Sequence, residues 1–217
     1  MSISLGSTTI GSLYLGSTKV GEAYLGSTKI FSSSPVLPQY TIRLQFTEGV
    51  TPSFSKGTAT QVSSSPNVWD LTYDNTVWEE LCSSQLNIIK VIGANTTGVV
   101  DMHNMFSGCS SLISVPLFDT SSVTDMGSMF FNCTSLTDIP LFDTSSVTNM
   151  GKRLGSMILR RGTFENCYNV KSGALALYRQ ASSQTTPPSD HDYTFANCGR
   201  DTTTGAAELA QIPSDWK

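Results

Sequence analysis

The sequence predicts an α+β protein: a short leucine-rich-repeat-like solenoid with 24-residue units, preceded by an α/β N-terminal cap and an N-terminal β-repeat anchor segment. The nonapeptide PLFDTSSVT occurs at Pro116–Thr124 and again, unchanged, at Pro140–Thr148. Self-similarity at a period of about 20–50 residues is typical of solenoids, in which each unit buries its apolar positions against the next. The segments LISVPL (112–117) and LTDIPL (136–141) fit the L-x-x-L-x-L pattern of leucine-rich repeats.

Equivalent residues of the repeat unit are expected to stack in one buried core. Two broken copies follow the regular pair, because TFENC (163–167) and TFANC (194–198) resemble MFFNC (129–133). Neighbouring strands lie about 4.8 Å apart, so equivalent side chains would touch. The predicted structural core of the repeats is Cys109, Leu112, Cys133, Leu136, Ile139, Cys167 and Cys198.

The five cysteines are expected to be buried thiols rather than disulfides or metal ligands. Four of them occupy the same position of the repeat, and the fifth is Cys82. The odd number of cysteines and the stacking geometry both disfavour a ladder of disulfides. A metal site is disfavoured because there is no Cys-x-x-Cys pair and no histidine cluster. We therefore expect no metal and no cofactor.

The chain divides into four predicted parts. These are N-terminal ten-residue β repeats at 1–31, a linker at 32–39, an α+β cap at 40–94, and the solenoid with its insertions and C-terminal cap at 95–217. Alternating apolar and polar residues predict strands in the cap, at 40–46, 58–62, 67–73 and 87–92. N-cap residues and apolar spacing predict a helix at 74–83, and apolar positions predict a second helix at 173–184.

Residues 3–31 consist of three similar units spaced by ten residues, ISLGSTTIGS, LYLGSTKVGE and the nine-residue AYLGSTKIF. Apolar and polar residues alternate around Gly-Ser in each unit, which predicts short strands joined by tight turns. Three such strands cannot form a core alone. We therefore expect residues 1–31 to be ordered in an assembly, most simply a homotrimer or a form bound to a larger particle.

Aspartates also recur at the repeat spacing, so that Asp119 stacks over Asp143 and Asp101 over Asp125. One interpretation is that each carboxylate accepts hydrogen bonds from backbone N–H groups in an Asx-turn. The other is a calcium ion bound between the carboxylates, although no D-x-D-x-D loop is present. The Asx-turn is the preferred interpretation.

Composition and charge disfavour several classes of protein. Charged residues make up 14% of the 217 residues, against about 25% in typical globular proteins, and serine and threonine fill the polar positions. The net charge of -4 disfavours a nucleic-acid binder, which usually carries a basic face. No segment approaches the roughly 20 apolar residues of a membrane span. Met1–Ile10 has neither the basic start nor the apolar run of a secretory signal.

The ionisable residues do not have the spacing of a catalytic site. The two histidines are His103, beside a repeat methionine, and His191, in the loop sequence SDHDY. Glu79 and Glu80 are adjacent on the predicted helix and point to different faces, so they do not form a carboxylate pair. We expect no enzymatic activity and no catalytic residue.

A ten-residue insertion, close to KRLGSMILRR at 152–161, separates the regular repeats from TFENC. It holds four of the 13 basic residues, after a stretch from Val91 to Gly151 without Lys or Arg. Insertions in solenoids become loops on one face, often the binding face. The loop is either solvated, with charges that pair with the aspartate columns, or a contact for an anionic partner, to which arginine bonds bidentately. The candidate partner-binding residues are Lys152, Arg153, Arg160 and Arg161.

Two parts of the chain resemble known proteins. MFSGCSSL (105–112) and FDTSSVTDM (118–126) are similar to the units of bacterial surface leucine-rich-repeat proteins of the BspA type. This resemblance implies an adhesive surface rather than an enzyme. The tandem LYLGSTKV units and the closing AAELAQIPSDWK resemble structural proteins of gut tailed phages, including crAss-like phages. The second resemblance implies a virion protein.

The sequence therefore predicts a non-enzymatic phage virion protein, of structural, decoration or fibre type, whose solenoid mediates attachment to a host surface or glycan. Residues 1–31 are expected to contact other virion proteins, and the protein is expected in the virion. The alternative is a bacterial cell-surface leucine-rich-repeat adhesin. Neither hypothesis involves a nucleic-acid or membrane partner.

Overall fold

The computed structural model describes residues 13–15, 18–20, 22–25, 28–32, 37–152 and 161–217. The chain forms two compact units, Met1–Leu37 and Pro38–Lys217. The repeats lie in the second unit, where one hydrophobic core extends from Ile42 to Trp216. No helix in the described part of the chain is long and apolar enough to cross a membrane.

In the first unit the described strands form two antiparallel hairpins. β1 (Leu13–Leu15) pairs with β2 (Thr18–Val20), and β3 (Glu22–Leu25) pairs with β4 (Thr28–Ser32). The expectation of one strand per ten-residue unit is wrong for the last two units, because each of them contributes two strands that flank its Gly-Ser pair. The first ten-residue unit lies outside the described residues.

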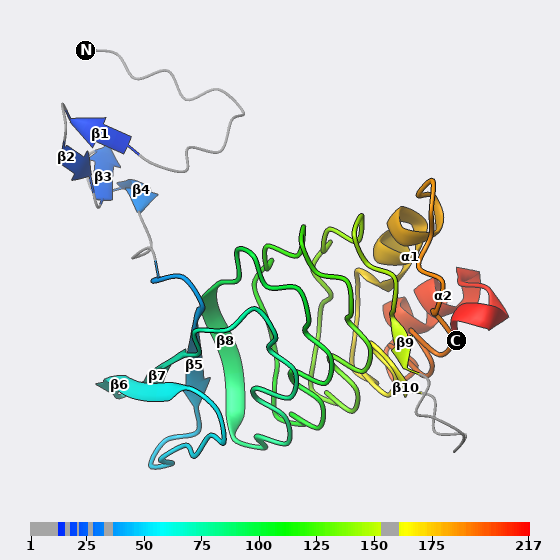
Figure 1. The fold of residues 1–217 in the computed structure, drawn as a ribbon, viewed down its shortest axis with the longest axis horizontal. Helices are drawn as coiled ribbons and strands as arrows, with labels where there is room; N and C mark the ends of the chain where they lie inside the picture. Colours follow the sequence, from blue (N-terminus) through cyan, green and yellow to red (C-terminus); the bar gives the residue numbers. More distant parts are fainter. Residues whose placement is uncertain (1–12, 16–17, 21, 26–27, 33–36, 153–160) are drawn as a thin grey trace. The chain divides into compact units, whose positions relative to one another are not determined.

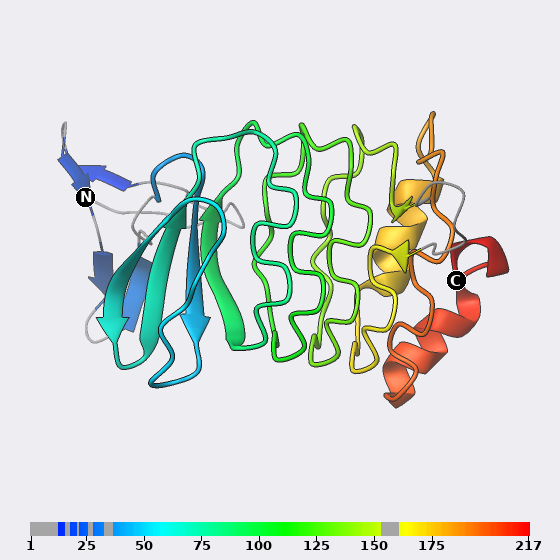
Figure 2. The same cartoon turned by 60° about the horizontal axis from the view of Figure 1, so that its bottom comes forward.

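The second unit begins with an open antiparallel sheet in the order β6-β7-β5-β8. Its strands are β5 (Thr41–Phe46), β6 (Thr58–Ser64), β7 (Asn67–Thr72) and β8 (Ile88–Asn95), which confirms the four strands predicted for this region. Side chains alternate between the two faces of a strand, so Ile42, Leu44 and Phe46 of β5 all enter the core. β6 is an exposed edge, whereas β8 adjoins the repeats (Figure 2).

After β8 the chain winds into stacked turns, each one repeat long (Figure 1). Isolated parallel bridges join Val77 to Asp101, Asp101 to Asp125 and Asp125 to Asn149, in steps of 24 residues. A further bridge joins Asn149 to Asp190 across the insertion. Every residue between β8 and β9 (Gly151–Lys152) is described, and none of them belongs to a named strand or helix. Single-residue bridges and turns therefore hold the repeats together.

The predicted fold class, an α+β leucine-rich-repeat-like solenoid, is therefore wrong. The named elements are mainly an open four-stranded antiparallel sheet and two short helices, and the L-x-x-L-x-L segments form no strands. The last leucine of each segment shows the reason, because Leu117 is 64% exposed and Leu141 is 53% exposed. A leucine-rich repeat would bury this residue. Here Phe118 and Phe142, one position later, enter the core instead.

The predicted helix at 74–83 is also wrong. These residues form the first of the stacked turns: the Trp78 N–H donates to the Asp101 carbonyl at 2.7 Å, and the Glu80 N–H donates to the His103 carbonyl at 3.0 Å. Glu80 has a φ of 59°, which a right-handed helix does not allow. Bonds to the next turn have replaced the bonds that a helix would make within itself.

Two short helices lie near the C-terminus. α1 (Ala174–Ser182) falls within the predicted helix at 173–184 and confirms it. α2 (Thr203–Gln211) was not predicted; it is capped by Thr202, whose hydroxyl oxygen accepts a hydrogen bond from the Gly205 N–H at 3.0 Å. A 3₁₀ turn, η1 (Ser214–Trp216), follows and buries Trp216.

The core of the stacked turns is a column of aromatic rings. The rings of Phe106, Phe130 and Phe164 are nearly parallel, with centroid separations of 5.4 and 5.3 Å. The column continues through Phe195 to Trp216. Stacked aromatic pairs contribute stability beyond the area that they bury. Around this column, the seven predicted core residues are all buried: Cys109, Leu112, Cys133, Leu136, Ile139, Cys167 and Cys198.

Candidate functional site

The basic insertion leaves the stacked turns from a two-stranded root. β9 pairs antiparallel with β10 (Arg161–Gly162), with Gly151 opposite Gly162. A Cβ added at Gly151 would overlap the Asp192 carbonyl, and one added at Gly162 would overlap the Tyr193 carbonyl. Both glycines are therefore required for close backbone packing, which fixes the root against the last turn.

The structure describes part of the predicted basic site. Arg161 is half-buried, and its guanidinium carbon lies 4.3 Å from the centre of the Phe131 ring, a cation–π contact. The Arg161 charge also opposes the effect of burial, which raises the pKa of Glu165. The backbone of Lys152 lies in β9, whereas Arg153 and Arg160 lie outside the described residues. Arg161 is thus already engaged by its own fold.

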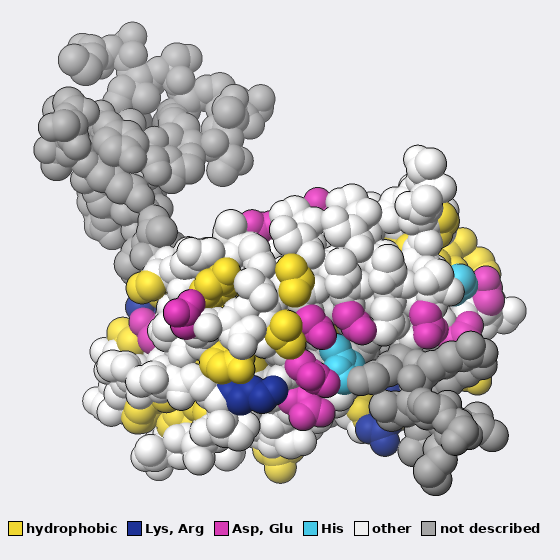
Figure 3. All heavy atoms as spheres, viewed as in Figure 1, with side chains coloured by type: hydrophobic (Ala, Val, Ile, Leu, Met, Phe, Trp, Pro, Cys, Tyr) yellow, Lys and Arg dark blue, Asp and Glu magenta, His cyan; other side chains and the backbone are white. Residues whose placement is uncertain are grey.

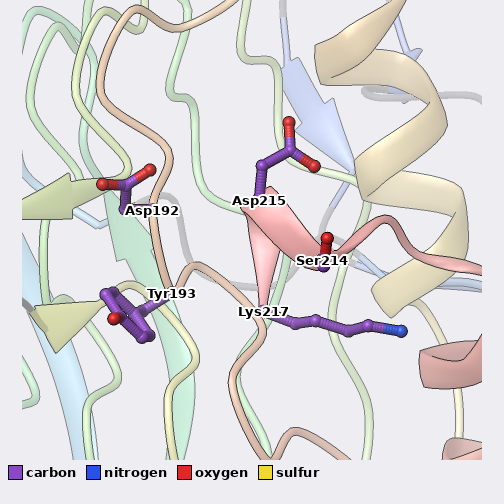
Figure 4. Close-up of a pocket in the computed structure, with 5 residues that line it drawn as sticks. All are labelled: Asp192, Tyr193, Ser214, Asp215 and Lys217. Carbon is purple, nitrogen blue, oxygen red and sulfur yellow. The ribbon is translucent and has the colours of Figure 1, made fainter.

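A hollow of about 150 Å³ lies beside this root (Figure 4). Asp192 and Tyr193 line it from the segment that packs against Gly151 and Gly162, and the other lining residues come from η1 and the C-terminus. They are Ser214, Asp215 and Lys217. The Lys217 ammonium group donates to the Leu209 carbonyl at 2.9 Å, so it is tied to the end of α2. The other lining residues are therefore two aspartates, a serine and a tyrosine.

The wall behind the hollow is held by stacked rings. The His191 ring lies 4.4 Å from the Trp216 ring, nearly parallel to it. His191 Nδ1 is 2.9 Å from the Pro188 carbonyl oxygen, and its Nε2 is 3.5 Å from the carboxylate of Asp215. Tyr178 of α1 contacts the same tryptophan edge-on. These contacts position Asp215 at the rim.

This arrangement suits a polar ligand that carries hydroxyl groups. The carboxylates of Asp192 and Asp215 can accept hydrogen bonds from hydroxyls, and the ring of Tyr193, 44% exposed, offers an apolar face. Sequence reasoning missed these residues. A signal existed, because Tyr193 stands at the same left-handed position of its turn as Asn104 and Ser128, where an aromatic residue is unexpected.

Acidic side chains gather in a row over one face of the stacked turns (Figure 3). Asp101 and Asp125 belong to the column of parallel bridges that joins Val77, Asp101, Asp125 and Asn149. Asp101 Oδ1 accepts a hydrogen bond from the His103 N–H, and Asp125 Oδ1 accepts one from the Gly127 N–H, both at 2.8 Å. Asp143 caps Ser145 in the same way, at 2.9 Å. These bonds confirm the predicted Asx-turns. Within the described residues no group of three or more metal-ligating side chains is found.

The cysteines form a ladder of thiol-to-carbonyl hydrogen bonds. Cys109 Sγ donates to the Cys82 carbonyl at 3.0 Å, and Cys133 Sγ donates to the Phe106 carbonyl at 3.2 Å. Cys167 bonds to Phe130 in the same way, at 3.1 Å. Burial raises the pKa of the Cys109 thiol to about 12 and raises the pKa of the other four thiols as well. The thiolate is the nucleophile, so these residues are structural.

The remaining ionisable candidates are also engaged. His103 Nδ1 lies 3.1 Å from Glu79 Oε1 and is buried. Glu80 accepts a hydrogen bond from the Asn104 amide at 3.4 Å. The two glutamates therefore have separate partners, and they do not converge on a common point where a substrate could bind.

One family model matches part of the chain. Residues 77–167 are similar to the family described as "Mycoplasma protein of unknown function, DUF285". The matched segment is less than half of the sequence, and it begins at Val77, the first residue in the column of bridges. No curated protein and no solved structure is significantly similar to the chain. The similarity therefore covers the regular stacked turns and carries no activity with it.

Proposed function

We propose that this protein is a non-enzymatic attachment protein of a phage particle. Residues 1–31 contact other virion proteins as a homotrimer, and the second unit binds a host surface or glycan. The observation that carries the proposal is the position of the polar, aromatic-lined hollow beside the root of the basic insertion.

The rigidity of the root supports a binding role. β9 and β10 are fixed by backbone contacts that only glycine permits, so the two ends of the insertion are held at a defined place on the stacked turns. Preorganised elements lose less conformational entropy on binding. A solvated loop without a role would not need such close packing at its base.

The chemistry of the hollow supports a sugar as the ligand. Tyr193 supplies an exposed ring, while Asp192 and Asp215 supply acceptors for hydroxyl groups. The Arg161 guanidinium on the adjoining root is held over the Phe131 ring, so the two aspartates of the hollow favour a sugar that is rich in hydroxyl groups. Nucleophilic catalysis is disfavoured because the thiols are buried and their pKa values are raised.

A bacterial cell-surface adhesin is the second candidate. The match of residues 77–167 to a family described from Mycoplasma favours it, because Mycoplasma is a cellular organism. Both candidates share the same binding unit and differ in what residues 1–31 attach to. Mass spectrometry of purified particles and of cell envelopes from an infected culture separates them: enrichment in particles supports the virion protein, and enrichment in envelopes supports the adhesin.

An array of bacterial surface glycans probed with fluorescent full-length protein tests the attachment role. We expect binding to hydroxyl-rich glycans, reduced about tenfold by Tyr193→Ala, as is usual for an aromatic anchor. Val62→Ala is the matched control, because Val62 is 49% exposed on the distant edge strand β6. Binding that is equal in all three proteins would exclude the hollow, and an array without any binding would exclude glycan attachment.

Removal of residues 1–31 tests the anchoring role separately. The second unit has its own core, so the truncated chain should still bind the array. It should no longer be incorporated into particles. Incorporation of the truncated chain at the wild-type level would contradict the anchor.

A further inference from the structure

The imidazole ring of His191 stands behind the hollow and is fixed by a stack of aromatic rings. It lies nearly parallel to the ring of Trp216, with the two centroids 4.4 Å apart. Trp216 is 4% exposed and stacks in turn on Phe195, the last ring of the phenylalanine column. Because the imidazole is held in this plane, each of its two nitrogens has a defined neighbour.

The neighbour of Nδ1 determines which nitrogen carries the proton. Nδ1 of His191 lies 2.9 Å from the Pro188 carbonyl oxygen, and a carbonyl oxygen only accepts hydrogen bonds. Nδ1 therefore has to be the donor, and in the neutral imidazole Nε2 is left as an acceptor. The Pro188 carbonyl thus fixes the tautomer of His191.

The neighbour of Nε2 is the carboxylate of Asp215, whose Oδ2 atom is 3.5 Å away. In the neutral ring this contact joins two acceptors, so it contains no hydrogen bond. When Nε2 gains a proton it becomes a donor, and the same contact can close into a charge-assisted hydrogen bond. A bond between His191 and Asp215 therefore exists in only one of the two protonation states of the ring.

Asp215 is the member of this pair that a ligand would touch. It projects from η1 and lines the hollow (Figure 4), whereas His191 is not among the lining residues. The Asp215 side chain is 62% exposed and that of His191 is 26% exposed. His191 would therefore act on a bound ligand through Asp215.

Among the described residues, other ionisable side chains stand on the elements around the ring. They are Asp190 and Asp192 on its own segment, Tyr178 on α1, Arg161 on β10 and Lys217 after η1. The two cations have other partners, because Lys217 donates to the Leu209 carbonyl and Arg161 lies over the Phe131 ring. Of these types of side chain, histidine is the one whose charge ordinarily changes between about pH 5 and 8. The imidazole therefore decides the state of the contact with Asp215 in this range.

We propose that His191 is a positioning residue that makes ligand binding in the hollow depend on pH. Neutral His191 leaves the Asp215 carboxylate to accept a hydrogen bond from a ligand hydroxyl. Protonated His191 draws the carboxylate to its own Nε2–H, so the ligand loses that acceptor. Binding therefore weakens as the pH falls from about 8 to about 5. The effect on binding rests on the proposed function, whereas the contact between His191 and Asp215 does not.

NMR of the full-length protein, labelled with ¹⁵N-histidine and ¹³C-aspartate, tests the contact without a ligand. We expect the neutral ring of His191 to carry its proton on Nδ1. The chemical shift of the Asp215 carboxyl carbon should change with pH in step with the ring, and His191→Gln should abolish that change. A proton on Nε2 of the neutral ring, or an Asp215 carbon that does not follow the ring, would overturn the proposal.

The array of bacterial surface glycans, probed at two pH values, tests the effect on binding. We expect the full-length protein to bind about three- to fivefold less at pH 5.5 than at pH 7.5, the size expected for a largely exposed charge pair. His191→Gln should bring this ratio close to one, and so should Asp215→Asn at its exposed position. His103→Gln is the matched control, because His103 is the other histidine of the chain and contacts Glu79. It should keep the wild-type ratio.

The outcomes separate this proposal from the proposed function. A wild-type ratio of one, or an unchanged ratio in His191→Gln, would contradict the role of His191 while leaving glycan binding in place. An array without binding at either pH would exclude the proposed function. The NMR titration would then still decide whether protonated His191 captures Asp215.

Discussion

The antiparallel sheet and the stacked turns of the second unit are stabilised in different ways. In the sheet, β5 pairs with β7 and β8 through continuous runs of backbone hydrogen bonds. Because these bonds involve only backbone atoms, they are compatible with many different side chains. In the turns the bridges are single residues, and side chains make many of the bonds between neighbours. Thr120 Oγ1 donates to the Asp143 carbonyl at 2.8 Å, and Thr148 Oγ1 donates to the Thr124 carbonyl at 3.1 Å.

This difference explains why nine residues recur unchanged. In PLFDTSSVT the phenylalanine joins an aromatic column, the aspartate caps the turn, and both threonines bond to the neighbouring turn. Serine and threonine fill the polar positions of this chain, and several of them hold neighbouring turns together. Substitutions in a strand leave its backbone hydrogen bonds to the neighbouring strand intact. Substitutions in one of these turns remove side chains that bond to the neighbouring turn.

The largest expected effect is in the aromatic column. Phe130→Ala removes a fully buried ring between Phe106 and Phe164 and should lower the free energy of unfolding by about 3–5 kcal/mol. Val62→Ala, on the exposed edge strand, should change it by less than about 0.5 kcal/mol. Urea denaturation followed by circular dichroism measures both. Similar losses in the two variants would contradict the contrast between the regions.

The next effect is the loss of one hydroxyl. Thr120 is 1% exposed, and Thr120→Val keeps its shape but leaves the Asp143 carbonyl without its donor, at a cost of about 1–3 kcal/mol. Thr60→Val, on the exposed strand β6, should be neutral or slightly stabilising, because β-branched apolar residues favour strands. Equal effects in urea denaturation would show that the hydroxyl bonds between turns contribute little.

A smaller effect of opposite sign is expected at Asp101. Burial, together with the charges of Asp125 and Glu79, raises the pKa of Asp101. Its folded pKa therefore lies above the unfolded one, so the contribution of this group to stability is fully present below the unfolded pKa and is lost as pH rises through the folded pKa. Asp101→Asn should stabilise the protein at pH 7, by up to about 1 kcal/mol, because the group is half-exposed.

The same variant keeps the turn, because Asn149 already caps an equivalent one and its amide donates to Asp125 at 2.8 Å. The gain should disappear below the unfolded pKa of about 3.9, where the wild-type carboxyl is protonated. Thermal melts at pH 7 and pH 3 measure it. A gain of equal size at both pH values would assign the effect to packing rather than to charge.

The smallest expected change is at an exposed leucine. Leu141→Ser should alter the free energy of unfolding by less than about 0.5 kcal/mol, whereas Leu136→Ala, fully buried in the same turn, should cost about 2–5 kcal/mol. A leucine-rich repeat would require a large loss in both. Denaturation in dilute solution measures the pair, and a large loss for Leu141→Ser would contradict its observed exposure.

The candidate site was only partly predictable from sequence. The length and charge of the insertion placed it at residues 152–161, because an extra segment between repeats has to leave the stack, and β9 and β10 stand at its two ends. The hollow was missed because its lining combines residues 192–193 with residues 214–217. No spacing along the chain indicates that these two segments meet; the packing of η1 against the last turn brings them together.

The sequence by itself determined the period of 24, the burial of the seven predicted core residues, the strands of the sheet and the capping role of the aspartates. Each of these depends on spacing along the chain and on the chemistry of a single residue type. Only the tertiary structure decided that residues 74–83 form a turn and that Leu117 points to solvent. The physical reason is that hydrogen bonds from one turn to the next compete with the hydrogen bonds of a local helix or strand. Which set of bonds forms depends on the neighbouring turn, which is distant in sequence.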